Sequence, residues 1–249
     1  MNKDINILRN EMHNSISMAD KYFEDGMLSN SCNELKIAIL KAEEVFHITD
    51  SVEDKNVLLE LYMKIAKYYN KIYTITCNKK DILPSCMYYE KLIYFYEEEL
   101  KNNSNNFIDT LNKVLETYVQ LLWVCLEIND CTSFERFMPK AYKYAVKLSR
   151  KSKVYEDEQY FILVNIFKGD YYKSLNKYKT AYLFYLVAMK KMKYIYKKMP
   201  NEGVLNDLII IYNNLSDIAK NLKRNKDKIK WDNIINKLEK ESEMFNNDK

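Results

Sequence analysis

Residues 169–188 read GDYYKSLNKYKTAYLFYLVA, and the spacing of small and large residues in this stretch decides the fold. Small residues stand at Gly169, Ala181 and Ala188, and tyrosines stand between them at the spacing of helix turns. Two helices can cross closely where their residues are small, while large residues fill the gap to the next helix pair. The stretch therefore predicts two antiparallel helices joined by a short turn.

The same pattern recurs elsewhere in the chain. Residues 19–38, ADKYFEDGMLSNSCNELKIA, repeat it, and a weaker third copy has Ala219, Leu222, Trp231, Ile235 and Leu238. Both clear copies resemble the helix hairpin of tetratricopeptide repeats, whose unit is about 34 residues long. Ala19 and Gly169 lie 150 residues apart, which fits units of about 50 residues built from longer helices.

Few residues in the chain can interrupt a helix, because it contains three glycines and three prolines in 249 residues. Long uninterrupted elements with helical periodicity favour helices over strands. Nine breaks divide the chain into ten segments of about 20 residues. These breaks lie at Phe23–Gly26, Asp50–Asp54, Cys77–Pro84, Asn102–Asn106, Asn129–Thr132, Ser152–Asp157, Leu175–Lys177, Pro200–Gly203 and Arg224–Asp227. We therefore predict an all-α fold of about ten antiparallel helices, stacked as five helix hairpins in a single domain.

The residue types that carry catalysis or bind metals are scarce. There are two histidines and five cysteines without metal-ligand spacing, and the chain lacks glycine-rich phosphate loops. The sequence predicts no catalytic residue, no metal and no cofactor. Many tyrosines fall on core positions of the repeat and only four arginines occur, so nucleic-acid binding is disfavoured. No apolar run is long enough to cross a membrane, and we expect a cytoplasmic protein.

The charge is spread unevenly along the chain. Residues 133–230 hold 22 lysines and arginines against 9 acidic residues, a surplus of 13 in a chain whose net charge is +4. An electropositive face of this kind favours an acidic partner, although lysines also commonly serve as solvated outer positions of helices.

Several stretches resemble the 14-3-3 family, whose members are dimers of nine antiparallel helices that bind phosphorylated peptides in a concave groove. Residues 56–62 (NVLLELY) resemble the start of its third helix, and residues 141–151 resemble its sixth. Residues 171–181 resemble the junction of its seventh and eighth helices, and Asn214-Leu215-Ser216 resembles a motif of its ninth. In this alignment residues 1–225 form the core, and residues 226–249 add a C-terminal helix and tail. A second alignment matches Lys168–Tyr172 to a run in the family's fifth helix.

The family's phosphate ligands are not matched in either alignment. Its Lys and Arg of the third helix fall on Met63 and Asn70 here, and its Arg-Tyr pair falls on Cys125-Leu126 or on Lys173-Ser174. The resemblance implies an atypical groove, with a basic stripe at helical spacing on one side and Lys173 with two asparagines on the other. The predicted peptide-binding residues are Lys64, Lys67, Asn70, Lys71, Lys173, Asn213 and Asn214.

The function predicted on these grounds is a non-catalytic adaptor that binds phosphorylated or acidic peptides of a protein partner. The resemblance also implies a homodimer, formed through Asp4–Leu28 and Tyr69–Tyr96, where Tyr88, Tyr94 and Phe95 add apolar surface. The alternative is an ordinary tetratricopeptide-like scaffold that binds unmodified peptides or helices.

Overall fold

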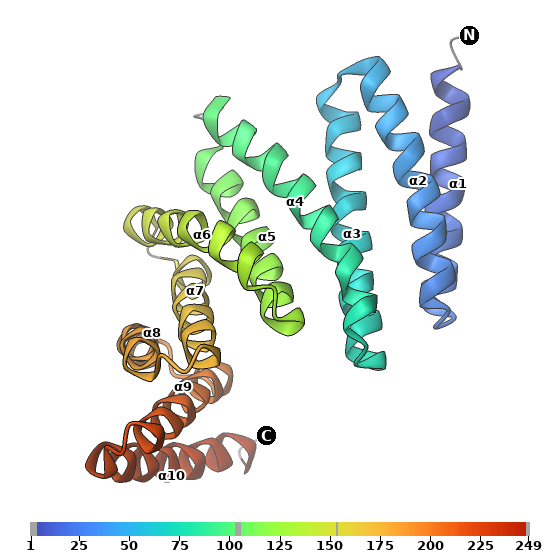
Figure 1. Ribbon diagram of the computed structural model, residues 1–249. Coiled ribbons are helices and arrows are strands. Elements are labelled where there is room, and N and C mark those ends of the chain that lie inside the picture. The colour runs from blue at the N-terminus through green and yellow to red at the C-terminus, as the bar shows by residue number, and fades with distance from the viewer. Residues whose placement is uncertain (1–3, 103–105, 153, 248–249) are drawn as a thin grey trace. The chain divides into compact units, whose positions relative to one another are not determined.

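The computed structural model describes residues 4–102, 106–152 and 154–247, and these residues form ten α-helices without a strand (Figure 1). Consecutive helices run antiparallel, which confirms the predicted fold class. The helices are α1 (Ile5–Glu24), α2 (Leu28–Thr49), α3 (Val52–Thr76), α4 (Lys79–Asn102), α5 (Phe107–Ile128), α6 (Cys131–Lys151), α7 (Tyr155–Ser174), α8 (Tyr178–Lys198), α9 (Glu202–Asn221) and α10 (Asn225–Asn247).

The chain forms two compact units, unit 1 (Met1–Thr110) and unit 2 (Leu111–Lys249), and each is described by itself. Unit 1 contains α1 to α4, and within it α2 packs on α1 and α3, and α3 packs on α4. Unit 2 contains nearly all of α5 and the helices α6 to α10, in which each helix from α6 onward packs on the next. The expectation of a single domain with a core at residues 1–225 stays a prediction.

Most residues that adopt a left-handed backbone conformation at the ends of these helices are not glycine. Asp50, Cys77, Asn129, Asn176 and Lys223 adopt positive φ angles between 46° and 60° at helix ends, as Gly26 does at 75°. Asparagine and aspartate tolerate this left-handed conformation better than most residues. A chain with so few glycines can therefore still turn tightly between its helices.

In unit 1 a polar cluster joins the start of α3 to α1. The Ser51 hydroxyl caps α3 by accepting a hydrogen bond from the Asp54 backbone N–H at 3.1 Å. The buried Asp54 carboxylate accepts hydrogen bonds from Arg9 of α1 at 2.7 and 3.3 Å. These bonds, led by the one from Arg9, hold the pKa of Asp54 below its usual value. Asp54, whose backbone N–H is capped by Ser51, thus also joins α3 to α1.

In unit 2, residues 169–188 form the predicted hairpin between α7 and α8. The ring of the fully buried Tyr185 lies so close to Gly169 that an added Cβ would meet it at 2.8 Å. Glycine therefore allows α7 and α8 to approach, and the Tyr185 hydroxyl donates a hydrogen bond to Asp170. Tyr172 and Tyr178 are partly buried and pack against the same core.

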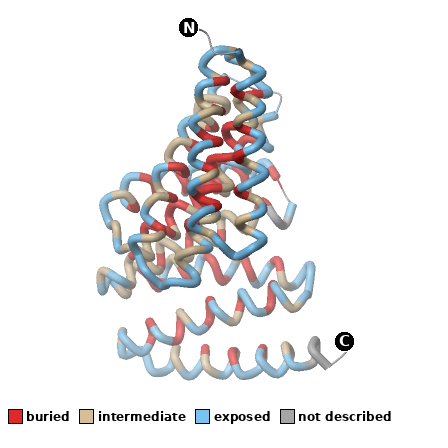
Figure 2. Tube along the Cα trace, turned by 90° about the vertical axis from the view of Figure 1, so that its right-hand side faces the viewer, coloured by how far each residue is buried: buried red, intermediate tan, exposed pale blue. Residues whose placement is uncertain are grey.

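The weak third copy also forms a helix pair. Trp231, Ile235 and Leu238 of α10 are buried, and the Trp231 indole N–H donates a hydrogen bond to the Tyr182 hydroxyl at 3.1 Å. Along these helices buried positions alternate with exposed ones, as an amphipathic pattern requires (Figure 2).

Several breaks between helices are shorter in the structure than predicted. The break expected over Cys77–Pro84 is shorter, because α4 already starts at Lys79 and contains Pro84. Pro84 is the sixth residue of α4, so its missing N–H removes one hydrogen bond to the carbonyl four residues earlier, and the helix continues past it. None of the helices in the described residues is both long and apolar enough to cross a membrane.

Candidate functional site

The residues predicted to bind peptide fall on three helices in two units. Lys64, Lys67, Asn70 and Lys71 lie on α3 in unit 1, whereas Lys173 lies on α7 and Asn213 and Asn214 lie on α9 in unit 2. Since each unit is described by itself, a single groove lined by both sets stays a prediction.

The α3 residues make contacts within unit 1. Lys64 forms an ion pair with Asp20 of α1, and the Lys71 ammonium lies 4.2 Å from the centre of the Phe23 ring. The Asn70 amide donates a hydrogen bond to the Tyr89 hydroxyl at 2.8 Å. These contacts give the predicted stripe a structural role between α1 and α4, because the side chains already have partners there.

The residues on α7 and α9 do come together. The Lys173 ammonium donates a hydrogen bond to the Asn214 side-chain oxygen at 3.2 Å and lies 3.6 Å from an Asp217 carboxylate oxygen. Asn213 is exposed. Asp217 offsets the charge of Lys173, so this cluster is less attractive to an anion than Lys173 alone would be.

The surface expected to form a dimer is partly core. Tyr88 is buried and packs against Tyr62 and Tyr69, with ring centres 5.9 and 6.4 Å apart. The expectation that Tyr88 contributes exposed apolar surface is therefore wrong, because its side chain closes the gap between α3 and α4. Tyr94 does remain exposed, at 64%.

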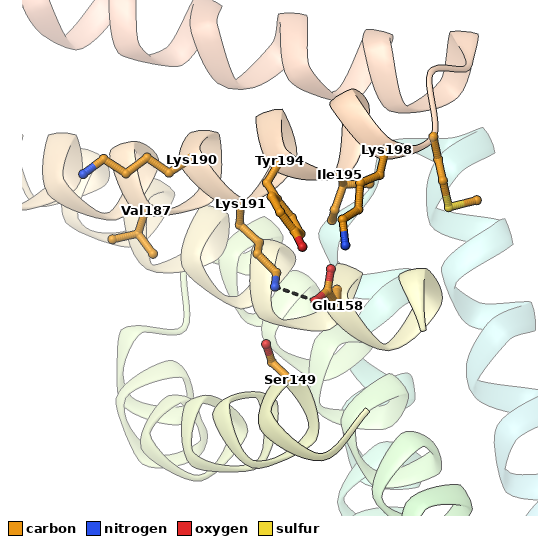
Figure 3. A pocket seen from close by; sticks show the side chains of 9 residues that line it. Ser149, Glu158, Val187, Lys190, Lys191, Tyr194, Ile195 and Lys198 are labelled. Atoms are coloured by element: carbon orange, nitrogen blue, oxygen red, sulfur yellow. Dashed lines mark hydrogen bonds and ion pairs between the residues drawn. The ribbon is translucent and has the colours of Figure 1, made fainter. Parts of the chain in front are cut away.

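A more favourable site lies over α6, α7 and α8 in unit 2. A pocket of about 640 Å³ is lined by Ser149, Glu158, Val187, Lys190, Lys191, Tyr194, Ile195, Lys198 and Met199, and we call it the lysine–tyrosine pocket. Figure 3 shows Lys191, Tyr194 and Lys198 of α8 pointing toward Glu158 of α7. Lys191 and Lys198 share one face of α8, because residues seven apart lie within about 20° of each other on a helix.

The charges in this pocket are only partly balanced. Glu158 is the one carboxylate among the residues that line it, and it pairs with Lys191 at 2.6 Å. The Lys198 ammonium lies 4.5 Å from the centre of the Tyr194 ring. A hydrogen bond with Tyr194, and to a smaller degree the charge of Glu158, raise the pKa of Lys198 above its ordinary value. Lys198 and Lys190 therefore present positive charge without a carboxylate of their own in the lining.

Apolar side chains also line the pocket beside the lysines. Ile195 is buried, while Val187 and Met199 are 40% and 50% exposed. A ligand that carries an anionic group beside an aliphatic one would satisfy both parts of this surface. The arrangement offers amines and a phenol as hydrogen-bond donors, which suits binding of carboxylates or phosphates.

The sequence contained a signal for this pocket that we did not use. Its lysines lie inside the basic stretch 133–230, and Lys191, Tyr194 and Lys198 recur at helical spacing. Glu158 could not be assigned to the pocket from spacing, because it comes from another helix. Among the described residues there is no group of three or more His, Cys, Asp or Glu side chains that could hold a metal ion.

Comparison with known proteins supports the fold only. No family model matches the chain, and no curated protein sequence matches it. The crystal structure of BtubC (BKLC) from P. vanneervenii is similar with a TM-score of 0.60 and 12% identity, over 96% of this chain and 92% of that one. At that identity the likeness shows a shared helical array and nothing about function.

Two structures of the nuclear import adaptor Nro1 are more distant. One, described as a hypoxic regulator of sterol synthesis, has a TM-score of 0.39 and 10% identity over 96% of this chain and 89% of its own. The other, from S. pombe, has a TM-score of 0.36 and 10% identity over 96% and 94%. Likenesses of this size carry no argument about this chain.

Proposed function

We propose that this protein is a non-catalytic adaptor that binds an acidic segment of another protein in the lysine–tyrosine pocket. The observation that carries the proposal is the imbalance of charge there, because Lys190, Lys191 and Lys198 line the pocket together with one described carboxylate, Glu158. The excess of basic residues over residues 133–230 strengthens the attraction for an acidic partner. Apolar walls beside the lysines supply the contact area that charge alone does not.

An adaptor role is what the 14-3-3 resemblance implies, but the binding site proposed here is the lysine–tyrosine pocket and not the groove of that family. A lysine holds phosphate or carboxylate as a point charge, without the two-pronged geometry of arginine. We therefore propose that phosphorylation is tolerated by the pocket and is not required. The groove predicted from Lys64, Lys67, Asn70, Lys71, Lys173, Asn213 and Asn214 remains the competing location for a 14-3-3-like ligand.

A selection experiment tests the proposal. Random peptides of about 12 residues, which are about 40 Å long when extended, are displayed and selected on the whole protein. We expect enrichment of Asp and Glu beside aliphatic residues. In the double variant Lys190→Glu and Lys198→Glu, the affinity of the selected peptides should fall about tenfold, and more at low salt, because the reversed charges repel the ligand.

The matched control is the double variant Lys179→Glu and Lys193→Glu. Both lysines are exposed on α8 and do not line the pocket, so the net charge changes equally while the site is left intact. Selected peptides without acidic enrichment, or equal losses in the two double variants, would refute the proposal. Phosphoserine in place of one selected acid then separates the two ligand types: a gain beyond about tenfold favours a dedicated phosphate site.

A homodimer and a cytoplasmic location remain proposals. Exposed apolar residues do occur in the expected dimer surface, among them Ile7, Met18, Leu83, Met87 and Tyr94. Light scattering at micromolar concentration should give twice the mass of 29.9 kDa, and a monomer mass would remove the dimer.

A further inference from the structure

A second hollow lies between α6 and α7, and Lys168 is part of its lining. It measures about 350 Å³ and is lined by Phe134, Glu135, Met138, Pro139, Tyr142, Lys168, Tyr171 and Tyr172. The Lys168 ammonium lies between two aromatic rings, 4.2 Å from the centre of Tyr142 on α6 and 4.2 Å from that of Phe184 on α8. One side chain of α7 therefore touches both flanking helices.

Lys168 has no carboxylate partner among the described residues. The acid in the lining of this hollow, Glu135, accepts a hydrogen bond from the Tyr171 hydroxyl at 2.5 Å. Burial lowers the pKa of Lys168, as expected for an amine that leaves water without gaining a counter-charge. A partly buried ammonium with aromatic neighbours alone is a strong site for an incoming carboxylate, because the new pair would be screened less than one at the open surface.

The residues that border Lys168 and those that line the lysine–tyrosine pocket share helix faces, and we call the surface along these faces the groove. Tyr142 and Ser149 are seven residues apart on α6, as are Phe184, Lys191 and Lys198 on α8, so each set shares one helix face. The first of each set borders Lys168, and the later ones line the lysine–tyrosine pocket. α7 forms the floor, since it supplies both Lys168 and Glu158. Along α8 the step from Phe184 to Tyr194 and Lys198, at the far end of the lysine–tyrosine pocket, is 10 to 14 residues, or about 15 to 21 Å.

We propose that this groove recognises the spacing of two acidic residues in one extended segment, with Lys168 binding the first carboxylate and Lys198 binding the second. An extended chain advances about 3.3 Å per residue, so the two acids are about four to six residues apart. An aliphatic residue between them would lie against Val187, which stands between the two anchors on α8. This inference rests on the proposed function and adds the spacing rule.

Side-chain packing favours a peptide over single-stranded nucleic acid in the groove. Bases bind by stacking on free aromatic faces, but Tyr142 and Phe184 each already have Lys168 over their rings. Phe184 also stacks on Tyr172, with ring centres 5.5 Å apart and planes 5° from parallel. The charged ends of the lysines remain for an anion, while the faces needed for stacking are occupied.

A series of labelled synthetic peptides tests the spacing rule on the whole protein. Each peptide carries two glutamates in a neutral background of Ser, Ala and Val, with the separation varied from about two to about ten residues. Peptides with one glutamate, and with glutamines in place of both, serve as references. We expect the best affinity at a separation of about four to six, about three- to tenfold tighter than with one glutamate.

Variants of Lys168 assign the gain to its ammonium. In Lys168→Met the gain from the second glutamate should disappear, so that the variant binds two-glutamate peptides no more tightly than one-glutamate peptides at any separation. If methionine at position 168 lowers the stability of the protein, Lys168→Gln repeats the test. Lys179→Met, on α8, is the control for the loss of one lysine outside the groove. Thermal unfolding by circular dichroism verifies that each variant is folded.

The outcomes separate the two proposals. A flat dependence on separation, or a spacing preference that survives in Lys168→Met, overturns the spacing rule, while sensitivity to Lys190→Glu with Lys198→Glu would still uphold the acidic pocket. Glutamate peptides that bind no better than glutamine peptides overturn both. An oligouridylate of similar length that binds more tightly than every peptide would overturn the choice of a peptide ligand.

Discussion

Two lysines that contact neighbouring helices, Lys91 in unit 1 and Lys168 in unit 2, differ in how their charges are balanced. In unit 1, Lys91 of α4 pairs with Glu43 of α2 at 2.6 Å, and the Tyr62 hydroxyl of α3 donates to the same carboxylate at 2.5 Å. In unit 2, Lys168 lies between aromatic rings without a carboxylate among the described residues.

The charge of each whole unit follows the same division. Residues 1–110 hold 13 basic and 18 acidic residues, whereas residues 111–249 hold 26 basic and 17 acidic residues. Lys91 thus has a carboxylate partner within unit 1. In unit 2, Lys191 is paired with Glu158 but Lys168 has no described carboxylate partner. The side chains, rather than the helix arrangement, decide where a ligand is attracted.

The largest effect that we expect concerns the helix spacing beneath the unit 2 groove. Gly169→Ala should lower the free energy of unfolding by about 2 kcal/mol, because the new Cβ meets the buried Tyr185 ring. Gly203→Ala is the control: its Cβ would be 3.4 Å from Asn201 Oδ1, an ordinary contact, so it should change stability by less than about 0.5 kcal/mol. Urea unfolding measures both.

The hairpin of α1 and α2 in unit 1 indicates a second substitution that should offset part of the cost of Gly169→Ala. At the positions equivalent to Gly169 and Tyr185 in the repeat, unit 1 has Ala19 and Leu35, both buried. Gly169→Ala combined with Tyr185→Leu should therefore cost less than the sum of the two single changes by about 1 kcal/mol. Additive costs would show that the close approach does not set the choice of glycine.

An effect of intermediate size is expected when Lys91 and Lys168 are each replaced by methionine and the losses of stability are compared. Lys91→Met should destabilise the protein by about 1 kcal/mol, because Glu43 and Tyr62 lose their cation, although partial exposure of Lys91 and Glu43 limits the loss. Lys168→Met should change stability by less than about 0.5 kcal/mol, because the lost contact with the rings is offset by relief of an unpaired, partly buried charge. Equal losses in thermal or urea unfolding would contradict the difference between the two lysines.

The smallest effect is a difference between Glu43 and Asp170 in how their contributions to the free energy of unfolding depend on pH. Burial raises the pKa of Glu43, but hydrogen bonds from Lys91 and Tyr62 outweigh it, so the net pKa lies below its usual value. Its contribution to stability is therefore present at neutral pH and lost as the pH falls through the lowered pKa. The cost of Glu43→Gln should shrink between about pH 5 and pH 3, by less than about 1 kcal/mol.

For Asp170 in unit 2 the contribution to the free energy of unfolding should change with pH in the opposite direction. Burial raises the pKa of Asp170, more than the Tyr185 hydrogen bond and the Lys173 charge lower it. Its favourable contribution is thus present at low pH and lost as the pH rises through the raised pKa, so the cost of Asp170→Asn should shrink as the pH rises from about 3 to about 6. Slopes of the same sign for the two carboxyl groups in urea unfolding at several pH values would contradict this assignment.

The sequence alone determined the helices of this protein. Helical periodicity, end residues such as Asn176 and the small residues at Ala19 and Gly169 are local signals, because they depend on neighbours within a few turns of the chain. They predicted ten helices, their approximate ends and the close approach of α7 to α8. The basic character of residues 133–230 was also legible in the composition.

The tertiary structure decided which side chains share a site. Lys64 and Lys71 were predicted to line a groove, yet they contact α1, and Tyr88 lies in the core. Lys168 gains its environment from Tyr142 and Phe184, which belong to other helices. Periodicity shows which residues share a face of one helix, but it does not show which neighbouring helix that face meets. The charge balance around each lysine depends on that second fact, because an ion pair forms between helices and is set by distance in space rather than by separation along the chain.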